Sequence, residues 1–422
     1  MLGKQTLGLL NRVAKLGVLR LILLVLMLIQ NVLIVRFLPL EEIGWYYLMV
    51  TVAYLGNAAM FVGADFYLQR QLAYLSVDQP LYRPALAKYM LLTAALGSII
   101  VLVTSVIYFS TAASIGWLEP VLICTALSMA TYFSTLGRNL CQLAAYPVYS
   151  TLGPIGEGIF RAAALCGLVA VTGKAYAGSV AVLSIIGALF SAVITWGLLL
   201  KAKKGHEKAE IGGDVSNPPS YLNSPRQLGD AVLSIGASGI LNWAQLQGYR
   251  PLLISSSSGG ATIVGTVSFL STLGSTTSNA VFTILAQIQV PQQYRSKGAS
   301  TSHYLLILGG VTLGLSIACL PAGALFLWIS NKWQLLEVVY LVAVGVLVEA
   351  GNAAIGVCTH HMNAQGKTLW GLPQAGLIGC MATFIMLLMP MATDPYIAVA
   401  IALVIGQALT VSIVLYLTFR PE

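Results

Sequence analysis

The chain has 422 residues, of which 57% are hydrophobic and 9% are charged. Soluble domains carry about 25% charged residues, so this composition excludes a soluble globular protein. The formal net charge of +8 does not require a nucleic-acid partner, because membrane proteins concentrate Lys and Arg on one side of the bilayer. We therefore predict an all-α polytopic membrane protein.

The apolar segments predict about twelve transmembrane helices, since a span needs about 20 apolar residues. A basic segment, 1–15, is expected to lie on the membrane surface before the first span. The segment 201–228 is too polar to span, so we expect residues 1–200 and 229–422 to form two six-helix lobes joined by a cytoplasmic linker. The predicted spans are 16–36, 44–64, 86–109, 117–137, 148–171, 177–200, 230–250, 262–287, 302–322, 335–358, 369–390 and 396–419.

Basic residues predict the orientation of these spans. With both termini in the cytoplasm, 17 of the 22 Lys and Arg residues fall on the inner side and four on the outer side, and Arg161 lies within the membrane. Such an excess on the inner side is typical of cytoplasmic loops. A faint repeat links the halves, because Gly44 opens span two and Gly265 lies early in span eight. Two halves of six helices would be related by an axis along the membrane normal.

Charged side chains within the spans are the main functional candidates, because ionised groups at membrane depth are costly unless they face protein or water. Glu157 and Arg161 are four residues apart and share one helix face. They either bind substrate and relay protons or form a pair that fixes helix packing. Glu349 has no cation at helical spacing, so it is a second candidate for proton coupling. Asp65 and Arg70 are predicted to form an inner gate, to anchor the helix end, or to contact substrate.

Polar side chains follow one face of spans seven and eight at spacings of three and four. They either line a hydrated cavity or form hydrogen bonds between helices. The residues predicted to line a cavity are Gln30, Asn31, Asn242, Gln245 and Asn279.

No motif indicates a cofactor or an enzyme. The six cysteines are scattered, and the neighbouring His360 and His361 point in different directions on a helix, so we expect no metal. The run 366–368 resembles the end of a phosphate-binding loop but lacks its first glycine. An ion gradient, of H⁺ or Na⁺, is therefore the expected energy source.

Four segments, taken in order, resemble Wzx-type polysaccharide flippases of the multidrug/oligosaccharidyl-lipid/polysaccharide (MOP) exporter superfamily. Two positions depart from the family pattern, with Tyr249 replacing an acidic residue and Val267 an aromatic one. The four segments are 36–46, 63–70, 138–145 and the pair 249–250 followed by Gly265.

This resemblance implies two six-helix lobes that form a V around a central cavity. It implies transport of an undecaprenyl-diphosphate-linked oligosaccharide, such as an O-antigen repeat unit, to the periplasmic leaflet of a bacterial inner membrane. A polysaccharide polymerase and a chain-length regulator are implied partners besides membrane lipids. Relatives use a cationic cavity, which suits a diphosphate. The candidates for that charge are Arg161, Arg20 and Arg250.

Two other functions fit the sequence less well. A cation-coupled drug or metabolite exporter of the MATE type shares the superfamily but favours an acidic cavity. A membrane glycosyltransferase or polymerase would carry large loops, whereas every predicted loop here is short except 201–228.

Overall fold

The computed structural model describes residues 2–58, 82–112, 116–143, 148–202, 225–256, 259–365, 367, 369–388 and 394–420. Every element of regular structure in these ranges is helical. The predicted gate residues Asp65 and Arg70, and residues 203–224 of the predicted linker, lie outside them.

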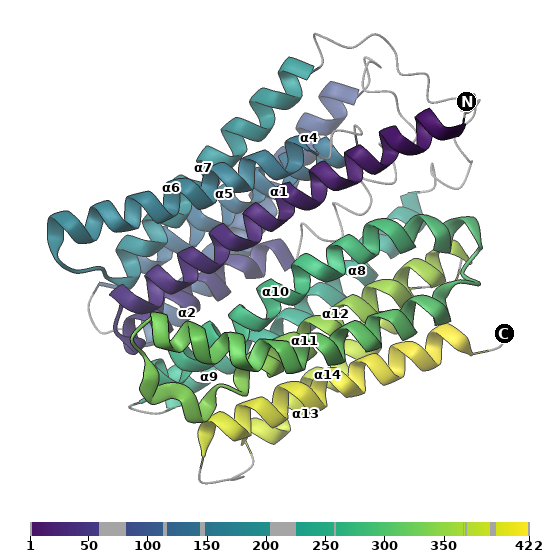
Figure 1. The fold of residues 1–422 in the computed structure, drawn as a ribbon. Helices are drawn as coiled ribbons and strands as arrows, with labels where there is room; N and C mark the ends of the chain where they lie inside the picture. The colour runs from purple at the N-terminus through teal and green to yellow at the C-terminus, as the bar shows by residue number, and fades with distance from the viewer. Residues whose placement is uncertain are drawn as a thin grey trace. The chain divides into compact units, whose positions relative to one another are not determined.

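The helices follow the order of the predicted spans (Figure 1). They are α1 (Leu2–Phe37), α2 (Leu40–Gly56), α4 (Tyr82–Ala112), α5 (Leu118–Leu143), α6 (Tyr149–Thr172), α7 (Ala177–Ala202), α8 (Pro225–Gln247), α9 (Tyr249–Ser256), α10 (Gly260–Arg295), α11 (Thr301–Ile329), the 3₁₀-helix η3 (Trp333–Val338), α12 (Leu341–Ala364), α13 (Gly371–Leu388) and α14 (Pro395–Phe419).

Nine helices within the described ranges are long and apolar enough to cross a membrane. The three other predicted spans, 44–64, 230–250 and 262–287, overlap α2, α8 and α10 in their described residues. The prediction of an all-α polytopic membrane protein is confirmed.

Two of the differences from the predicted span boundaries mark changes in helix type or helix breaks. The tenth span was expected from residue 335, but Trp333–Val338 form η3 and α12 begins at Leu341. The seventh span ends at Gln247 and is followed by the turn at Gly248 and the short helix α9. Pro251 explains this break, because proline lacks the N–H that a continuous helix would need there and is tolerated in the first turn of a new helix.

Short polar contacts fix two helix starts. The Glu42 carboxylate accepts a hydrogen bond of 2.7 Å from the backbone N–H of Ala177, the first residue of α7. At α14, the Asp394 carboxylate accepts one of 2.8 Å from the N–H of Tyr396, and Pro395 occupies the first turn. Both carboxylates thus satisfy N–H groups that a helix start leaves free, and they complement the helix dipole.

The contacts divide the chain into two compact units. Unit 1 comprises Met1–Leu26, Val52–Leu168 and Gly178–Gly236, and unit 2 comprises Met27–Thr51, Val169–Ala177 and Ala237–Glu422. The lobe boundaries expected from the sequence, at 200 and 229, stay a prediction.

Within unit 2, α2 and α10 approach each other at two glycines. A methyl group at Gly44 would overlap the backbone carbonyl of Ala261, and one at Gly265 would overlap that of Leu40. The two contacts are reciprocal, since each glycine meets the residue four positions before the other glycine. The sequence repeat thus marks a pseudo-symmetric helix crossing, as small residues allow in membrane proteins.

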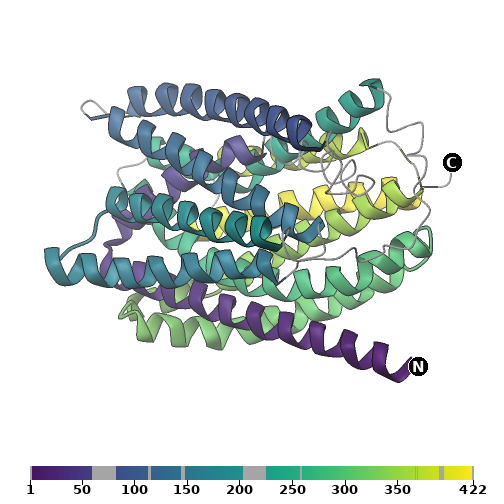
Figure 2. The ribbon, with the colours of Figure 1, turned by 90° about the horizontal axis from the view of Figure 1, so that it is seen from above.

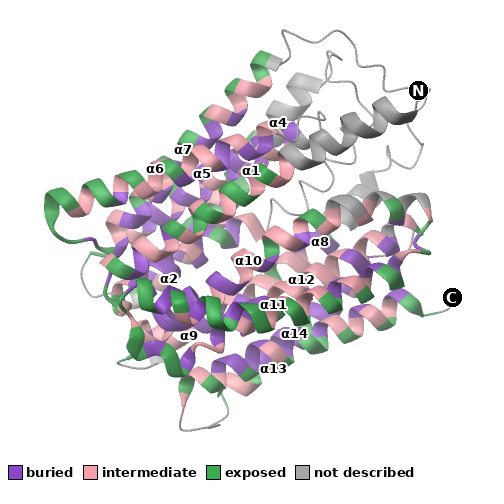
Figure 3. Cartoon of the chain, viewed as in Figure 1, coloured by how far each residue is buried: buried purple, intermediate pink, exposed green. Residues whose placement is uncertain are grey.

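One face of α11 is exposed (Figure 3), and its large exposed residues are apolar. Leu306, Leu313 and Ile317 are 75%, 66% and 64% exposed, whereas Tyr304 and Leu308 on the opposite face are buried. Figure 2 shows this helix along the edge of unit 2. A face of this kind is suited to lipid chains and not to water.

We predict that Gly44→Ala destabilises the protein by about 1–3 kcal/mol, because its methyl group overlaps backbone that cannot rotate away. Gly314→Ala is the matched control, since Gly314 lies within a helix and has open space around its Cα. The control should be neutral or stabilising by about 0.5–1 kcal/mol. Thermal unfolding in detergent measures both, and equal stability of the two variants would contradict the close contact.

Candidate functional site

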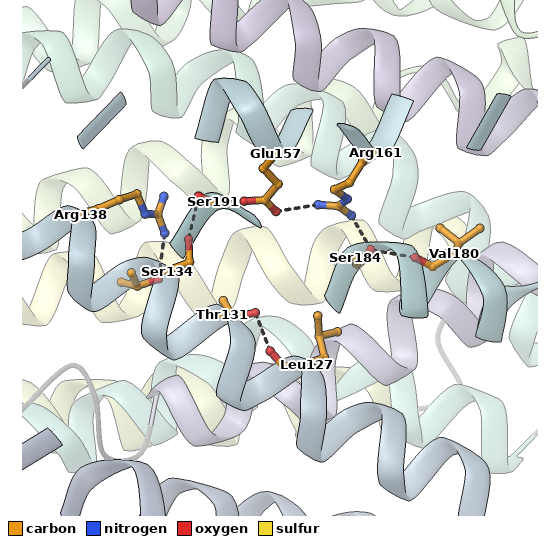
Figure 4. Close-up of polar contacts among 10 residues, drawn as sticks. Leu127, Thr131, Ser134, Arg138, Glu157, Arg161, Val180, Ser184 and Ser191 are labelled. Atoms are coloured by element: carbon orange, nitrogen blue, oxygen red, sulfur yellow. Dashed lines mark hydrogen bonds and ion pairs between the residues drawn. The ribbon is translucent and has the colours of Figure 1, made fainter. Parts of the chain in front are cut away.

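The Glu157–Arg161 pair forms the charged centre of unit 1 (Figure 4). Arg161 Nη1 lies 3.2 Å from Glu157 Oε1, as the four-residue spacing predicted. Arg161 Nη2 also donates a 2.6 Å hydrogen bond to Ser184 Oγ on α7, and that hydroxyl donates to the carbonyl of Val180. The side chains of Arg161 and Glu157 keep 18% and 21% of their surface exposed, so both remain reachable.

Glycines make room for this pair and its helix. A methyl group at Gly187 on α7 would overlap the Arg161 side chain. Gly153 lies against Ser191 of α7, and Gly158 lies against Leu26 of α1. The glycine-rich start of α6, which also contains Pro154, therefore lets neighbouring helices pack closely while α6 continues to Thr172.

A second arginine lies in the same polar region, and the sequence analysis did not select it. Arg138 Nη2 donates to Thr135 Oγ1 at 2.8 Å, while its buried Nε has no hydrogen-bond partner. Close to this contact, the Ser134 hydroxyl of α5 donates a hydrogen bond of 3.0 Å to Ser191 Oγ of α7. The sequence analysis used Arg138 as a charge that marks the inner side of the membrane and as the start of the segment 138–145, but not as a site residue.

Arg20 lies on α1 in unit 1 and is partly buried. Its Nε is enclosed by protein and has no hydrogen-bond partner. The guanidinium therefore retains a donor that a further acceptor can use.

Arg250 forms the charged centre of unit 2. It is 6% exposed and stands at the start of α9, immediately after the helix break. Its Nε donates to Tyr249 Oη at 3.2 Å and its Nη1 donates to Thr51 Oγ1 at 2.6 Å. The guanidinium carbon lies 5.3 Å from the centre of the Tyr47 ring and 5.6 Å from that of Tyr249. Both rings are within cation–π range.

All of these Arg250 contacts are neutral. Within the described part of the chain, the one ion pair joins Arg161 and Glu157, so no carboxylate there compensates Arg250. Among the described residues, Arg250 is thus a buried cation whose contacts are all neutral, which is a costly arrangement for a charge.

Glu349 lies on α12 and begins a chain of side-chain hydrogen bonds in unit 2. Asn352 donates to Glu349 Oε2 at 3.4 Å, and Gln407 of α14 donates to Asn352 Oδ1 at 3.1 Å. Gln245 of α8 donates to Gln407 Oε1 at 3.0 Å, and Thr410 donates to Gln245 Oε1 at 3.1 Å. Gln245 was predicted to line a cavity, and the structure places it fully buried within this chain. Gln407 was not selected from the sequence, although it is the only amide side chain in α14.

The other residues that were predicted to line a cavity differ from one another in burial and in hydrogen bonding. Gln30 is buried, whereas Asn31 is partly buried. Asn242 Oδ1 is buried without a hydrogen-bond partner. Asn279 is exposed, and its side chain accepts a 2.9 Å hydrogen bond from Thr283. The described residues contain no cluster of His, Cys, Asp and Glu that could hold a metal ion.

Comparisons with known proteins place the fold among transporters. No family model and no curated protein sequence matches the chain. Among solved structures it resembles an inward-facing multidrug resistance MATE family transporter of the MOP superfamily, with 12% identity, a TM-score of 0.60, and coverage of 95% of this chain and 97% of that one. It also resembles the lipid II flippase MurJ in an inward closed conformation, with 11% identity, a TM-score of 0.61, and coverage of 96% and 87%.

A third similar structure is a MOP superfamily transporter from Pyrococcus furiosus, whose binding pocket is described as having reverse polarity. It has 11% identity, a TM-score of 0.63, and coverage of 96% of this chain and 95% of that one. At these identities the likeness concerns the fold. The chain therefore has the fold of MOP superfamily transporters, and a multi-pass membrane location follows from that fold and from the apolar helices.

We predict that Ser184→Ala lowers the free energy of unfolding by about 1.5–3 kcal/mol, because it removes a short hydrogen bond to a charged group. Ser191→Ala on the same helix is the control, since it removes a bond between two neutral hydroxyls and should cost about 0.5–1.5 kcal/mol. Chemical unfolding in detergent compares them. A Ser184→Ala variant as stable as wild type would contradict an anchoring role for this hydroxyl.

Proposed function

We propose that this protein is a flippase for an undecaprenyl-diphosphate-linked oligosaccharide, such as an O-antigen or other surface-polysaccharide repeat unit. It moves this substrate from the cytoplasmic to the periplasmic leaflet of a bacterial inner membrane by alternating access, driven by an ion gradient. The MOP transporter fold and the lipid II flippase among its structural neighbours support a flippase. The resemblance of the sequence to Wzx-type proteins supports the substrate class.

The observation that supports this proposal is that the candidate arginines outnumber the carboxylates paired with them among the described residues. Arg161, Arg250 and Arg20 lie within predicted spans or next to a helix break, and Glu157 is the one carboxylate paired with any of them in the described chain. A diphosphate supplies negative charge for an arginine of this kind, and arginine binds phosphate oxygens through paired N–H donors.

Arg161 is the best placed of the three to exchange partners. Its two terminal nitrogens contact Glu157 and Ser184, and both contacts leave part of the side chain exposed. A diphosphate approaching Arg161 would compete with Glu157 for the guanidinium and would repel that carboxylate. Substrate binding would therefore change the contact between Glu157 and Arg161, and release of the substrate would restore it.

We predict that Arg161→Ala abolishes flipping in proteoliposomes, because the diphosphate loses its charge partner. Arg161→Lys should retain part of the activity, since a lysine supplies one point charge but cannot replace the forked contacts. Arg420→Ala is the control, because Arg420 is exposed beyond the end of α14.

The abundance of each variant in the membrane separates function from folding. Normal flipping by Arg161→Ala at wild-type abundance would contradict the assignment. Loss of the variant from the membrane would instead indicate that Arg161 mainly stabilises the packing of α6 on α7.

A cation-coupled exporter of the MATE type is the alternative, since MATE transporters are among the structural neighbours. The two functions respond to Arg161→Ala in opposite directions. A cationic drug gains from removal of a positive charge at the binding site, whereas an anionic lipid diphosphate loses. Transport of both substrates by the same variant therefore distinguishes the alternatives.

We also propose that both termini and the 201–228 linker are cytoplasmic, on the basis of the 17-to-4 distribution of basic residues. A periplasm-only reporter, such as alkaline phosphatase, fused after Ser220 should then be inactive. The same reporter fused after Lys332, in the predicted outer loop between the ninth and tenth spans, should be active. High activity of the Ser220 fusion would overturn this orientation.

A further inference from the structure

While Glu349 is ionised, the hydrogen bonds of the chain that ends at its carboxylate all run in one direction, from donor to acceptor. An ionised carboxylate can only accept, so the Asn352 side chain must present its NH₂ group to Glu349 and its oxygen to the next partner. The same reasoning orients Gln407, then Gln245, until the chain ends at the hydroxyl of Thr410. Every donor therefore points towards Glu349, and the carboxylate charge sets the orientation of three amide groups.

Protonation of Glu349 allows the opposite direction. The carboxylic acid would donate to Asn352, and each amide would turn over and donate to the next one along the chain. Gln245 would then donate to Thr410 Oγ1, whose proton needs another acceptor. That acceptor is in place, because Thr410 Oγ1 lies 3.1 Å from the backbone carbonyl of Gly406. Both directions thus satisfy every side chain from end to end.

The chain is enclosed tightly, which limits it to these arrangements. Gln245 and Gln407 are 0% and 3% exposed. A methyl group at Gly351 would overlap Gln407, and one at Gly379 would overlap Thr410. Gln407 also donates to the carbonyl of Val348 at 3.4 Å, a contact that reversal would lose. This contact favours the direction that belongs to the ionised carboxylate.

Glu349 is the one carboxylate on α12, whose other titratable side chains are Cys358, His360 and His361. The helices that pack on α12 are α10, α11 and α14, and none of them contains a carboxylate. Within the described contacts, Glu349 has no ion-pair partner. The titratable side chains of these three helices are Tyr294 and Arg295 at the end of α10, His303, Tyr304 and Cys319 on α11, and Tyr396 and Tyr416 on α14.

We propose that Gln407 and Gln245 are positioning residues that transmit the protonation of Glu349 to α8 by reversing this hydrogen-bond chain. The chain reaches α8 at Gln245, three residues before the break at Gly248 and five before Arg250. A change in the direction of the chain therefore acts on the segment that carries Arg250. The inference rests on the proposed transport function for its purpose, but the reversal itself concerns the protein alone.

Infrared difference spectroscopy of the purified protein, without sugar lipid, tests the reversal. Acidification should produce a carboxylic acid band that is absent in Glu349→Gln. It should also shift a glutamine side-chain band, identified by ¹⁵N labelling of the amide and by its absence in Gln245→Leu. In Gln407→Leu the acid band should remain while the Gln245 shift disappears, because leucine neither donates nor accepts.

Thr410→Val is a second variant for the case that Gln407→Leu does not fold. It keeps the side-chain shape but removes the acceptor that the reversed chain needs, so the Gln245 shift should again disappear. Thr312→Val is the matched control, since the Thr312 hydroxyl bonds only within α11 in the described contacts, and the shift should persist.

Three results would overturn the proposal. They are a Gln245 shift that survives in Gln407→Leu, an acid band of Glu349 without any Gln245 shift in the wild type, and a Glu349 that does not titrate. Transport measured in proteoliposomes adds an independent arm, in which Gln407→Leu should flatten the pH dependence of the rate. Failure of the flippase assignment would remove the transport arm and leave the infrared result unchanged.

Discussion

The structure depends on one constraint, which is that every charge and polar group at membrane depth needs a partner within the protein. Unit 1 meets it with an ion pair, because Arg161 holds both Glu157 and Ser184. Unit 2 meets it without an ion pair, since its described partners for Arg250 are hydroxyls and aromatic rings. Among the described residues, Arg161 thus has a carboxylate partner, whereas the partners of Arg250 are neutral.

Local spacing made part of the site predictable. The pairing of Glu157 with Arg161 follows from helix geometry alone, because residues four apart are neighbours on one face. The positions of the nine described helices that are long and apolar enough to span likewise follow from the length that a bilayer requires. The faint repeat at Gly44 and Gly265 also had a structural meaning, although its reciprocal packing could not be read from two short matches.

Tertiary contacts were not predictable from the sequence. Ser184 lies 23 residues from Arg161, and Gln407 lies 162 residues from Gln245, so no local pattern relates them. A polar stripe on one helix is compatible with both a hydrated cavity and a buried network, and for Gln245 the structure has the network. The helix break at Gly248 could have been predicted from the sequence, because Pro251 marks the first turn of a new helix.

The two units stabilise their buried charges in different ways. This difference is relevant to how transport is coupled to an ion gradient. An ion pair such as Glu157–Arg161 responds to an approaching anion by direct Coulomb interaction, which acts over a few ångströms at the site itself. A chain of neutral amides carries no charge, so it can convey a protonation event between helices without placing a second ion in the membrane. A transporter that combines both devices can sense its anionic substrate in one unit and protons in the other. Alternating access then requires only that each device favours a different arrangement of its own helices.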